Sequence, residues 1–418
     1  MRRLAVLSFH TSPLVQPGVG DSGGMNVYVR ELVSSLAQAG VACDVFTRAW
    51  SADLADVVAV EPGFRVHHVE AGPLDEVAKE DLPALVPAFT AGVLDRVRDL
   101  GGVDAIHANY WLSGVAGHTL KHELDLPLVS TFHTLARAKA DPDSPEPGIR
   151  ERAEHEVIAC SDVILANGPE EADDLRHHYG ADPARIEIVP PGVDHAFFSP
   201  GDRDGARTAL GWSEPGRISE VGGRLARQHP VLLFVGRIQP LKGLDVAVRA
   251  LAALARTDAE LVVVGGPSGR GGAAELARVR QLVVDLGVGD RVRFEAPQPH
   301  HLLSTWYRAA DVVLVPSRSE SFGLVALEAA ACGTPVVAAA VGGLRTLVEH
   351  GRTGFLVDSR DPAKYAACVD GLLADPVRAA AMGAAAAERA RHYTWSTTAA
   401  RLRRVYADVS ARALVACS

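Results

Sequence analysis

Short runs of β-branched and aliphatic residues alternate along this chain with longer stretches whose apolar positions recur at helical spacing. Such alternation predicts parallel sheets covered by helices on both faces. A first series of runs ends before residue 190 and a second begins at residue 231, so we expect two similar α/β halves. The predicted strands are residues 4–9, 43–47, 105–108, 128–132, 163–166 and 186–189, then 231–235, 261–264, 292–294, 312–315, 335–337 and 354–357.

Proline- and glycine-rich sequence interrupts the alternation between residues 190 and 230, which predicts a linker and a surface insertion. A chain of 418 residues also fits two domains of about 200 residues each. We expect one domain over residues 1–196, a second over 197–392, and a final segment, 393–418. The amphipathic helix expected near the end of the chain, at residues 397–409, would cross back to the first domain.

Composition excludes two classes of protein. The net charge of −9 argues against a nucleic-acid partner, because such proteins carry a basic face. No apolar run approaches the roughly 20 residues of a membrane span. The apolar start of the chain reads as a first strand rather than a signal peptide, so a cytoplasmic enzyme is expected.

The five cysteines show neither C-x-x-C pairing nor the spacing of a metal site. Most of them stand in apolar surroundings. We therefore expect reduced, buried thiols and no zinc site.

Two glutamates, Glu320 and Glu328, stand eight positions apart in a segment that reads as the start of a buried helix. At that spacing both carboxylates would project from one helix face. A buried carboxylate is costly unless a ligand or a partner satisfies it, so the pair suggests a ligand rich in hydroxyl groups. A solvated helix face is the structural alternative.

Cationic and glycine-rich loops follow several predicted strands, where ligands of α/β proteins bind. Arg237 and Lys242 follow the strand at residues 231–235, and a guanidinium and an ammonium can hold a diphosphate between them. Gly23 and Gly24 precede a predicted helix, residues 27–38, whose amino end would attract an anion. The structural alternative for Arg237 and Lys242 is ion pairing within the protein. For Gly23 and Gly24 it is a flexible loop between strand and helix.

His133 follows the fourth predicted strand and is a further candidate, although a lone histidine is often structural. The chain has no Gly-Lys-Ser/Thr sequence of a phosphate-binding loop, which excludes a nucleoside-triphosphate motor.

Several motifs together resemble those of a known enzyme family. They are Glu320-x7-Glu328, His10-Thr-Ser-Pro, Gln16-Pro-Gly, Gly20-Asp-Ser-Gly-Gly-Met-Asn-Val-Tyr28, Tyr110-Trp-Leu-Ser-Gly114, His133-Thr-Leu135 and Gly265-Gly-Pro-Ser-Gly269. Nearly the whole chain resembles the retaining glycosyltransferases of family 4, and within them the D-inositol 3-phosphate glycosyltransferases of mycothiol biosynthesis. That family has the GT-B fold, with two Rossmann-like doubly wound domains that face a central cleft.

The resemblance implies transfer of N-acetylglucosamine from UDP-N-acetylglucosamine (UDP-GlcNAc) to 1D-myo-inositol 3-phosphate, with the anomeric configuration retained. It implies an acceptor-binding first domain, a nucleotide-sugar-binding second domain and no organic cofactor. It also implies a homodimer, and Mg²⁺ held largely by the backbone of Tyr307, Arg308, Ala310 and Thr334.

The resemblance assigns site residues by motif position. The implied acceptor residues are His10, Asp21, Ser22, Gly23, Gly24, Met25 and Asn26, with Lys79, Tyr110, Thr134 and Arg150 around the phosphate. The implied donor residues are Gln16, Pro17, Gly24, Arg237, Lys242, Gln298, Glu320, Gly323, Leu324, Val325 and Glu328. The implied catalytic residues are His133, Arg237, Lys242 and Glu320.

Three departures from the family pattern bear on substrate choice. Gln298 stands where these enzymes tend to have an arginine, the segment between Thr134 and Arg150 is shorter, and residues 212–228 form an enlarged surface loop. Two alternatives therefore remain. One is a paralogue that uses another nucleotide sugar and another acceptor, such as fructose 6-phosphate or an antibiotic precursor; the other is a nucleotide-sugar-binding protein without turnover.

Overall fold

The computed structural model describes residues 2–18, 20–139, 148–212, 229–269 and 271–417. The chain forms two compact units. The first comprises Met1–Val15, Gly24–Gly192 and Trp395–Ser418, and the second comprises Gln16–Gly23 and Val193–Thr394. Most of the surface loop expected at residues 212–228, and part of the segment expected to be short, lie outside the described residues.

An eight-stranded sheet forms the centre of the first unit, in the order β3-β4-β2-β1-β5-β6-β7-β8. All neighbouring pairs are parallel except β3 with β4. The strand order reverses between β1 and β5, which is where α/β sheets bind ligands. The strands are β1 (Arg3–Leu7), β2 (Ala42–Arg48), β3 (Val57–Glu61), β4 (Phe64–Val69), β5 (Ala105–Asn109), β6 (Leu128–Thr131), β7 (Val163–Ala166) and β8 (Ile186–Ile188).

The hairpin of β3 and β4 was absent from the predicted strands. Its signal is present in the sequence, since two valine-rich runs flank Pro62-Gly63. Gly63 has a φ of +84°, which a glycine adopts without strain. The antiparallel β3 forms an edge of the sheet.

Two apolar layers cover the first sheet, because successive strand residues point to opposite faces. Helices α2, α3, α4 and α5 contribute to one cluster of buried side chains, and α1 and α14 contribute to the other. The helices are α1 (Gly24–Gln38), α2 (Val86–Asp99), α3 (Trp111–Leu124), α4 (Gly148–Cys160), α5 (Pro169–Tyr179) and α14 (Trp395–Ser410), with 3₁₀ turns η1 (Leu82–Leu85), η2 (Arg137–Lys139) and η3 (Pro183–Arg185).

The second unit is built on a six-stranded parallel sheet in the order β11-β10-β9-β12-β13-β14. This is the strand order of a dinucleotide-binding fold, and it reverses between β9 and β12. All six strands match predicted ones. They are β9 (Val231–Val235), β10 (Glu260–Val264), β11 (Val292–Glu295), β12 (Val312–Val315), β13 (Val336–Ala339) and β14 (Gly354–Val357).

Helices again bury both faces of the second sheet. The side chains of α7, α8 and α12 pack in one cluster, and those of α9, α10 and α11 pack in the other. The helices are α6 (Arg203–Ala209), α7 (Leu244–Ala253), α8 (Gly272–Asp285), α9 (Leu303–Ala309), α10 (Leu324–Ala331), α11 (Leu344–Leu347), α12 (Pro362–Ala374) and α13 (Pro376–Ala390), with 3₁₀ turns η4 (Pro240–Lys242), η5 (Gly289–Arg291) and η6 (His300–Leu302).

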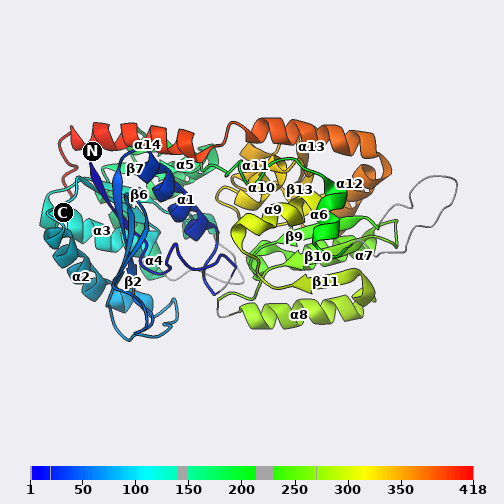
Figure 1. Ribbon diagram of the computed structural model, residues 1–418, viewed down its shortest axis with the longest axis horizontal. Helices are drawn as coiled ribbons and strands as arrows, with labels where there is room; N and C mark the ends of the chain where they lie inside the picture. The colour runs from blue at the N-terminus through cyan, green and yellow to red at the C-terminus, as the bar shows by residue number, and fades with distance from the viewer. Residues whose placement is uncertain (1, 19, 140–147, 213–228, 270, 418) are drawn as a thin grey trace. The chain divides into compact units, whose positions relative to one another are not determined.

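The last helix, α14, belongs to the first unit, which confirms the predicted return of the chain (Figure 1). It packs against α1, and the ring of Trp395 lies 5.7 Å from that of Tyr28. Tyr406 reaches the sheet, where its hydroxyl lies 2.8 Å from Nδ1 of His107. The other ring nitrogen of His107 lies 2.8 Å from the hydroxyl of Thr131. A buried polar chain thus fixes α14 to β5 and β6.

Acidification is expected to weaken this unit through His107. Burial lowers the pKa of His107 to about 3, whereas in the unfolded chain it is about 6.5. Below pH 6.5 the imidazole of His107 is protonated in the unfolded chain but stays neutral in the folded chain. The contribution of His107 to stability is therefore complete above pH 6.5 and is lost as the pH falls. Between pH 7 and 5 the free energy of unfolding should fall by about 2 kcal/mol from this residue.

Urea unfolding at both pH values would measure this effect. His107→Asn should show a smaller loss than the parent chain, and His155→Asn, on the exposed side of α4, should behave like the parent. Equal pH dependence in all three proteins would contradict the assignment.

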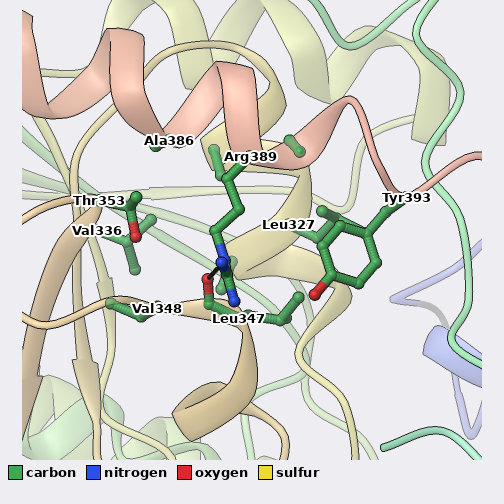
Figure 2. A pocket seen from close by; sticks show the side chains of 11 residues that line it. Leu327, Val336, Leu347, Val348, Thr353, Ala386, Arg389 and Tyr393 are labelled. Carbon is green, nitrogen blue, oxygen red and sulfur yellow. Dashed lines mark hydrogen bonds between the residues drawn. The ribbon is translucent and has the colours of Figure 1, made fainter.

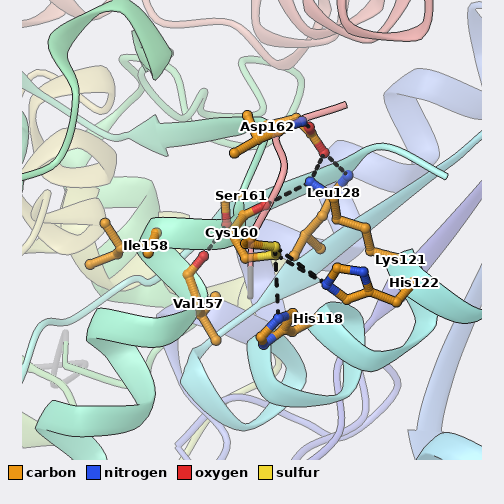
Figure 3. Close-up of a disulfide and its surroundings, with 12 residues drawn as sticks. His118, Lys121, His122, Leu128, Val157, Ile158, Cys160, Ser161 and Asp162 are labelled. Carbon is orange, nitrogen blue, oxygen red and sulfur yellow. Dashed lines mark hydrogen bonds and ion pairs between the residues drawn. A yellow bond between two sulfur atoms is a disulfide. The ribbon is translucent and has the colours of Figure 1, made fainter. Parts of the chain in front are cut away.

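Two of the five cysteines are oxidised, although all five were expected to be reduced thiols. Cys160, at the end of α4, forms a disulfide with Cys417, 257 residues later, while Cys43, Cys332 and Cys368 are free (Figure 3). Sequence spacing could not reveal this pair, because α14 carries the end of the chain back to α4.

None of the helices in the described part of the chain is long and apolar enough to cross a membrane.

Candidate functional site

The loops after β9 and β12 bring Lys242 and Glu320 into direct contact in the second unit. Nζ of Lys242 lies 2.7 Å from Oε2 of Glu320, and the hydroxyl of Ser317 donates to the same oxygen at 3.3 Å. Both charged side chains remain partly exposed, at 27% and 18%. The strand reversal between β9 and β12 therefore presents a cation and an anion together, where this fold binds ligands.

Glycines permit this close approach of the loops. Gly243 has a φ of +70°, and a Cβ there would lie 2.1 Å from the carbonyl oxygen of Pro316. Gly265, after β10, has a φ of +154°, and its Cβ would lie 1.9 Å from the carbonyl oxygen of Gly236. Any side chain at either position would push the strand ends apart.

Arg237 follows Gly236 and meets the segment Gln16–Gly23, which belongs to this second unit. Its Nη1 donates to the carbonyl oxygen of Asp21 at 3.3 Å. A Cβ on Gly23 would lie 3.0 Å from Nε of Arg237, so the guanidinium lies against bare backbone. Arg237 and Lys242 therefore stand on one loop, as predicted from their spacing.

Glu320 does not share a helix face with Glu328, contrary to the sequence-based expectation. Helix α10 begins at Leu324, after Gly323 in a left-handed conformation with a φ of +102°. A Cβ on Gly323 would lie 2.7 Å from Cδ2 of Leu344, so packing by α11 also favours glycine here. Glu320 thus lies in the loop before α10, and only Glu328 is helical.

Glu328 is buried and has partners within the protein. Its Oε1 accepts from Nε2 of His300 at 2.7 Å, and its Oε2 accepts from the hydroxyl of Tyr307 at 2.7 Å. Burial and the neighbouring carboxylate raise the pKa of Tyr307 well above its usual value, so the phenol keeps its proton and donates. Sequence reasoning missed His300, which had no signal beyond its place after β11.

The start of α10 leaves backbone donors without a side-chain cap. No side chain caps the helix at Gly323, and the N–H groups of Leu324 and Val325 lie in its first turn. Such groups, at the positive end of a helix, are suited to a phosphate. The role of residues 323–325 in donor binding stays a prediction.

Two predicted donor residues lie at the loop after β11. Nε2 of Gln16 donates to the carbonyl oxygen of Pro297 at 3.0 Å, and Nε2 of Gln298 donates to that of Ala296 at 2.9 Å. Pro17 follows Gln16 in the same segment of the second unit. The segment that carries Gln16 and Pro17 therefore contacts the loop that carries Gln298.

The four residues implied as magnesium ligands are neighbours but do not suit the ion as arranged. Tyr307, Arg308 and Ala310 lie at the end of α9, and Thr334 lies before β13. The carbonyl oxygen of Tyr307 already accepts from the Thr334 hydroxyl at 2.7 Å and from the Ala310 N–H at 3.3 Å. Mg²⁺ prefers carboxylate, phosphate and water oxygens, and this set offers none of the first two.

In the first unit, a second cluster surrounds Tyr110, directly after β5. Nζ of Lys79 lies 4.8 Å from the centre of the Tyr110 ring, and the guanidinium carbon of Arg150 lies 5.1 Å from it. The ring of His10, after β1, is 4.5 Å away. Tyr110 has a φ of +75°, an uncommon conformation for a tyrosine and one that marks functional loops. These residues meet where the order of the first sheet reverses.

Arg150 is held by a buried network. Its Nε lies 2.8 Å from Oε1 of Glu154, one turn along α4, and its Nη2 donates to the Thr134 carbonyl oxygen at 2.8 Å and hydroxyl at 3.0 Å. Glu154 also accepts from the Tyr179 hydroxyl and from the Ala136 N–H. The implied phosphate residues Tyr110, Thr134 and Arg150 are therefore neighbours, although Glu154 was not predicted.

His133 follows β6 and has a φ of +61°. Its Nε2 donates to Oδ1 of Asn109 at 2.9 Å, and its ring lies 4.8 Å from that of Tyr28. Burial, and secondarily the charge of His107, lower the pKa of His133 to about 3. The imidazole is thus neutral at physiological pH, which suits a positioning hydrogen bond better than an electrostatic role.

The predicted inositol-binding run, residues 21–26, is divided between the units at Gly23 and Gly24. In the first unit, Nδ2 of Asn26 donates to the hydroxyl of Thr11 at 2.6 Å and to the carbonyl oxygen of Ser12 at 2.6 Å. Met25 is partly buried against the core. Ser22, in the second unit, is buried. Asn26 therefore has a structural role in shaping the loop after β1.

The second unit also contains a pocket (Figure 2). Mostly apolar side chains of α10, β13 and α13 line it, and Arg389 enters it to donate to the carbonyl oxygen of Leu347 at 3.0 Å. None of the predicted donor residues is part of its lining. We regard it as a packing defect.

Comparison with known proteins places the chain in a family. The model of Glycosyltransferase Family 4 matches residues 22–197, and that of Glycosyl transferases group 1 matches residues 222–389. A D-inositol 3-phosphate glycosyltransferase of Thermomonospora curvata is 47% identical, over 97% of this chain and 95% of its own length. Its counterpart in Geodermatophilus obscurus is 49% identical, over 95% and 87%.

The chain belongs to glycosyltransferase family 4. Among its relatives, those named D-inositol 3-phosphate glycosyltransferase match it over nearly their whole length. The protein is therefore a glycosyltransferase, as the resemblance of its motifs implied.

Solved structures of glycosyltransferases confirm the fold. A sucrose-phosphate synthase from Thermosynechococcus elongatus has a TM-score of 0.90 and 32% identity, with 98% of this chain and 99% of that chain covered. Anabaena HepE, in complex with UDP and glucose, has a TM-score of 0.77 at 20% identity, over 98% and 100% of the two chains. The two doubly wound units are thus those of a GT-B glycosyltransferase.

Proposed function

We propose that this family 4 glycosyltransferase transfers N-acetylglucosamine from UDP-GlcNAc to 1D-myo-inositol 3-phosphate, with retention at the anomeric carbon. The arrangement around Tyr110 carries the acceptor half of the proposal. Lys79 and Arg150 lie over the same ring, and Thr134 is hydrogen-bonded to Arg150. Two cations and two hydroxyl groups suit a dianionic phosphate.

The relatives support the same acceptor. Those named D-inositol 3-phosphate glycosyltransferase share 46–49% of their residues with this chain. The identity extends over 95–99% of this chain.

For the donor, Arg237 and Lys242 would hold the diphosphate, Glu320 the sugar and Glu328 the ribose. The ion pair of Lys242 with Glu320 keeps both side chains in place before the donor arrives. A bound phosphate would pair with the Lys242 ammonium and partly replace its ion pair with Glu320. Glu328 would keep its hydrogen bonds to His300 and Tyr307, which orient its carboxylate.

In the proposed reaction, the bond between the anomeric carbon and the β-phosphate oxygen breaks. A hydroxyl oxygen of the inositol forms the new bond on the same face, and its proton passes to the departing phosphate. Negative charge grows on the UDP oxygen as the bond breaks, so fixed cations lower the barrier. His133 remains neutral and positions the sugar. We assign no step to magnesium, because its implied ligands do not suit the ion.

An acceptor other than inositol phosphate is the second candidate. The sucrose-phosphate synthase at 32% identity supports a different phosphorylated acceptor, such as fructose 6-phosphate, in the same fold. A protein without turnover is less consistent with the arranged pair of Lys242 and Glu320.

One experiment separates these functions. The protein would be incubated with UDP-GlcNAc and, in parallel, with inositol 3-phosphate, fructose 6-phosphate or no acceptor, and UDP release and product mass would be measured. Release that requires inositol 3-phosphate, with a product of the expected mass, supports the proposal. Release with fructose 6-phosphate alone, release without any acceptor, or none at all refutes it.

Replacing Lys79 by methionine is expected to raise the KM for inositol 3-phosphate about 10- to 100-fold, because a charge-assisted hydrogen bond to phosphate is lost. The KM for UDP-GlcNAc should stay unchanged, since the residues proposed to hold the diphosphate and the ribose, Arg237, Lys242 and Glu328, lie in the other unit. Initial rates at varied concentrations of each substrate measure both constants.

Arg98→Met, on the exposed side of α2, is the matched control and should leave both constants unchanged. Equal increases for the two substrates in Lys79→Met would argue against an acceptor phosphate near Tyr110.

We also propose a cytoplasmic homodimer, on the strength of the family resemblance. Light scattering of the purified protein would give its mass in solution. Fractionation of the producing cells would give its location.

A further inference from the structure

Two histidines and two cysteines converge in the first unit, and none of them belongs to either candidate substrate site (Figure 3). His118 and His122 stand one turn apart on α3, Cys160 ends α4, and Cys417 follows α14. One ligand atom from each residue lies within 4.8 Å of all the others. The proposed reaction gives this cluster no role.

The separations between sulfur and nitrogen fit a shared metal ion. Sγ of Cys417 lies 3.3 Å from Nε2 of His122 and 3.9 Å from Nε2 of His118, and Sγ of Cys160 lies 3.5 Å from Nε2 of His122. In tetrahedral zinc sites, Zn–S bonds of about 2.3 Å and Zn–N bonds of about 2.0 Å place sulfur and nitrogen roughly 3.5 Å apart.

The chain leading to Cys417 is anchored independently of its sulfur. The N–H of Val415 donates to Oδ1 of Asp162 at 2.6 Å. Oδ2 of the same carboxylate lies 2.9 Å from Nζ of Lys121 and accepts from the N–H of Leu128 at 2.8 Å. Lys121 also donates to the carbonyl oxygen of Cys160 at 2.8 Å. These buried contacts preorganise the end of the chain beside α3 and α4.

We propose that, in the reduced protein, His118, His122, Cys160 and Cys417 bind one Zn²⁺. Each thiol loses its proton on binding, and each neutral imidazole donates a nitrogen lone pair, so the site is the closed Cys₂His₂ type of structural zinc. The disulfide and the metal exclude each other, because a sulfur in the disulfide is no longer a thiolate. The ion would tie the segment after α14 to α3 and α4. This proposal does not depend on the proposed function.

Metal analysis of the full-length protein tests the site. The protein would be produced without a histidine tag, reduced with a phosphine, incubated with ZnCl₂, passed through a desalting column and analysed for zinc. About one zinc per chain is expected. Replacement by Co²⁺ should give the absorption of a tetrahedral ion with thiolate-to-cobalt charge transfer. Zinc below about 0.1 per chain in the reduced protein would overturn the proposal.

Variants separate the metal from the disulfide. His118→Asn and His122→Asn should lose the zinc yet form the disulfide on oxidation, whereas Cys417→Ser should lose both. Cys368→Ser, which changes a free cysteine of the second unit, should keep the zinc. Circular dichroism identifies any variant that fails to fold. The cobalt spectrum tests the metal site in the parent protein and so does not depend on the folding of a variant. Zinc retained in both histidine variants would contradict the assignment.

Discussion

Replacing Lys242 by methionine is expected to lower kcat with UDP-GlcNAc about 100- to 1,000-fold, the usual cost of removing one preorganised group that stabilises charge in a transition state. The ammonium lies at the strand reversal of the second sheet and is fixed by Glu320 at 2.7 Å. Its charge is needed most when the UDP oxygen gains charge, so kcat should fall more than the affinity for the donor. Single-turnover rates at saturating donor would measure the effect.

Lys364→Met is the matched control for this change. Lys364 also pairs with a carboxylate, since its Nζ lies 3.2 Å from Oδ1 of Asp358. Both side chains are exposed; Asp358 precedes α12 and Lys364 lies in it. The control should keep the parent rate. A loss of less than about tenfold in Lys242→Met would show that Lys242 is not the principal cation at the leaving group.

Replacing Arg150 by methionine should destabilise the first unit by about 3–5 kcal/mol, the cost of breaking a buried ion pair. The side chains of Arg150 and Glu154 are only 3% and 0% exposed. Among the residues that the structure describes, the Glu154 carboxylate would then keep the Tyr179 hydroxyl and the Ala136 N–H as partners. Urea unfolding followed by circular dichroism would measure the loss.

The double variant Arg150→Met, Glu154→Gln should recover part of that stability, because it removes the uncompensated charge. A loss below about 1 kcal/mol in the single variant would contradict the buried pair. Lys79 is consequently the better residue for testing acceptor binding, since its replacement leaves the Arg150–Glu154 network intact.

Much of the fold follows from local patterns in the sequence. Strands buried on both faces read as continuous β-branched runs, and all six strands of the second sheet were predicted for that reason. The placement of Arg237 and Lys242 after β9 then follows from topology, because the carboxyl ends of parallel strands meet at one edge. The hairpin of β3 and β4 was missed although Pro62-Gly63 marked its turn.

Features that depend on tertiary contacts were not predictable. Helical spacing placed Glu320 and Glu328 on one face, but packing against Leu344 favours the left-handed Gly323 that delays the start of α10. Likewise, no local signal links His300 to Glu328. The pairing of Cys160 with Cys417 joins segments that only the complete fold brings together.

The return of α14 has a consequence for dissecting this enzyme. The first unit needs Trp395–Ser418, which the chain supplies only after it has completed the second unit, and Gln16–Gly23 leaves the first unit early in the chain. Neither unit is thus formed by one continuous segment of the chain. A hybrid that exchanges the whole second unit with that of a relative requires four junctions. A fragment that stops at Gly192 would expose the apolar surface that α14 covers.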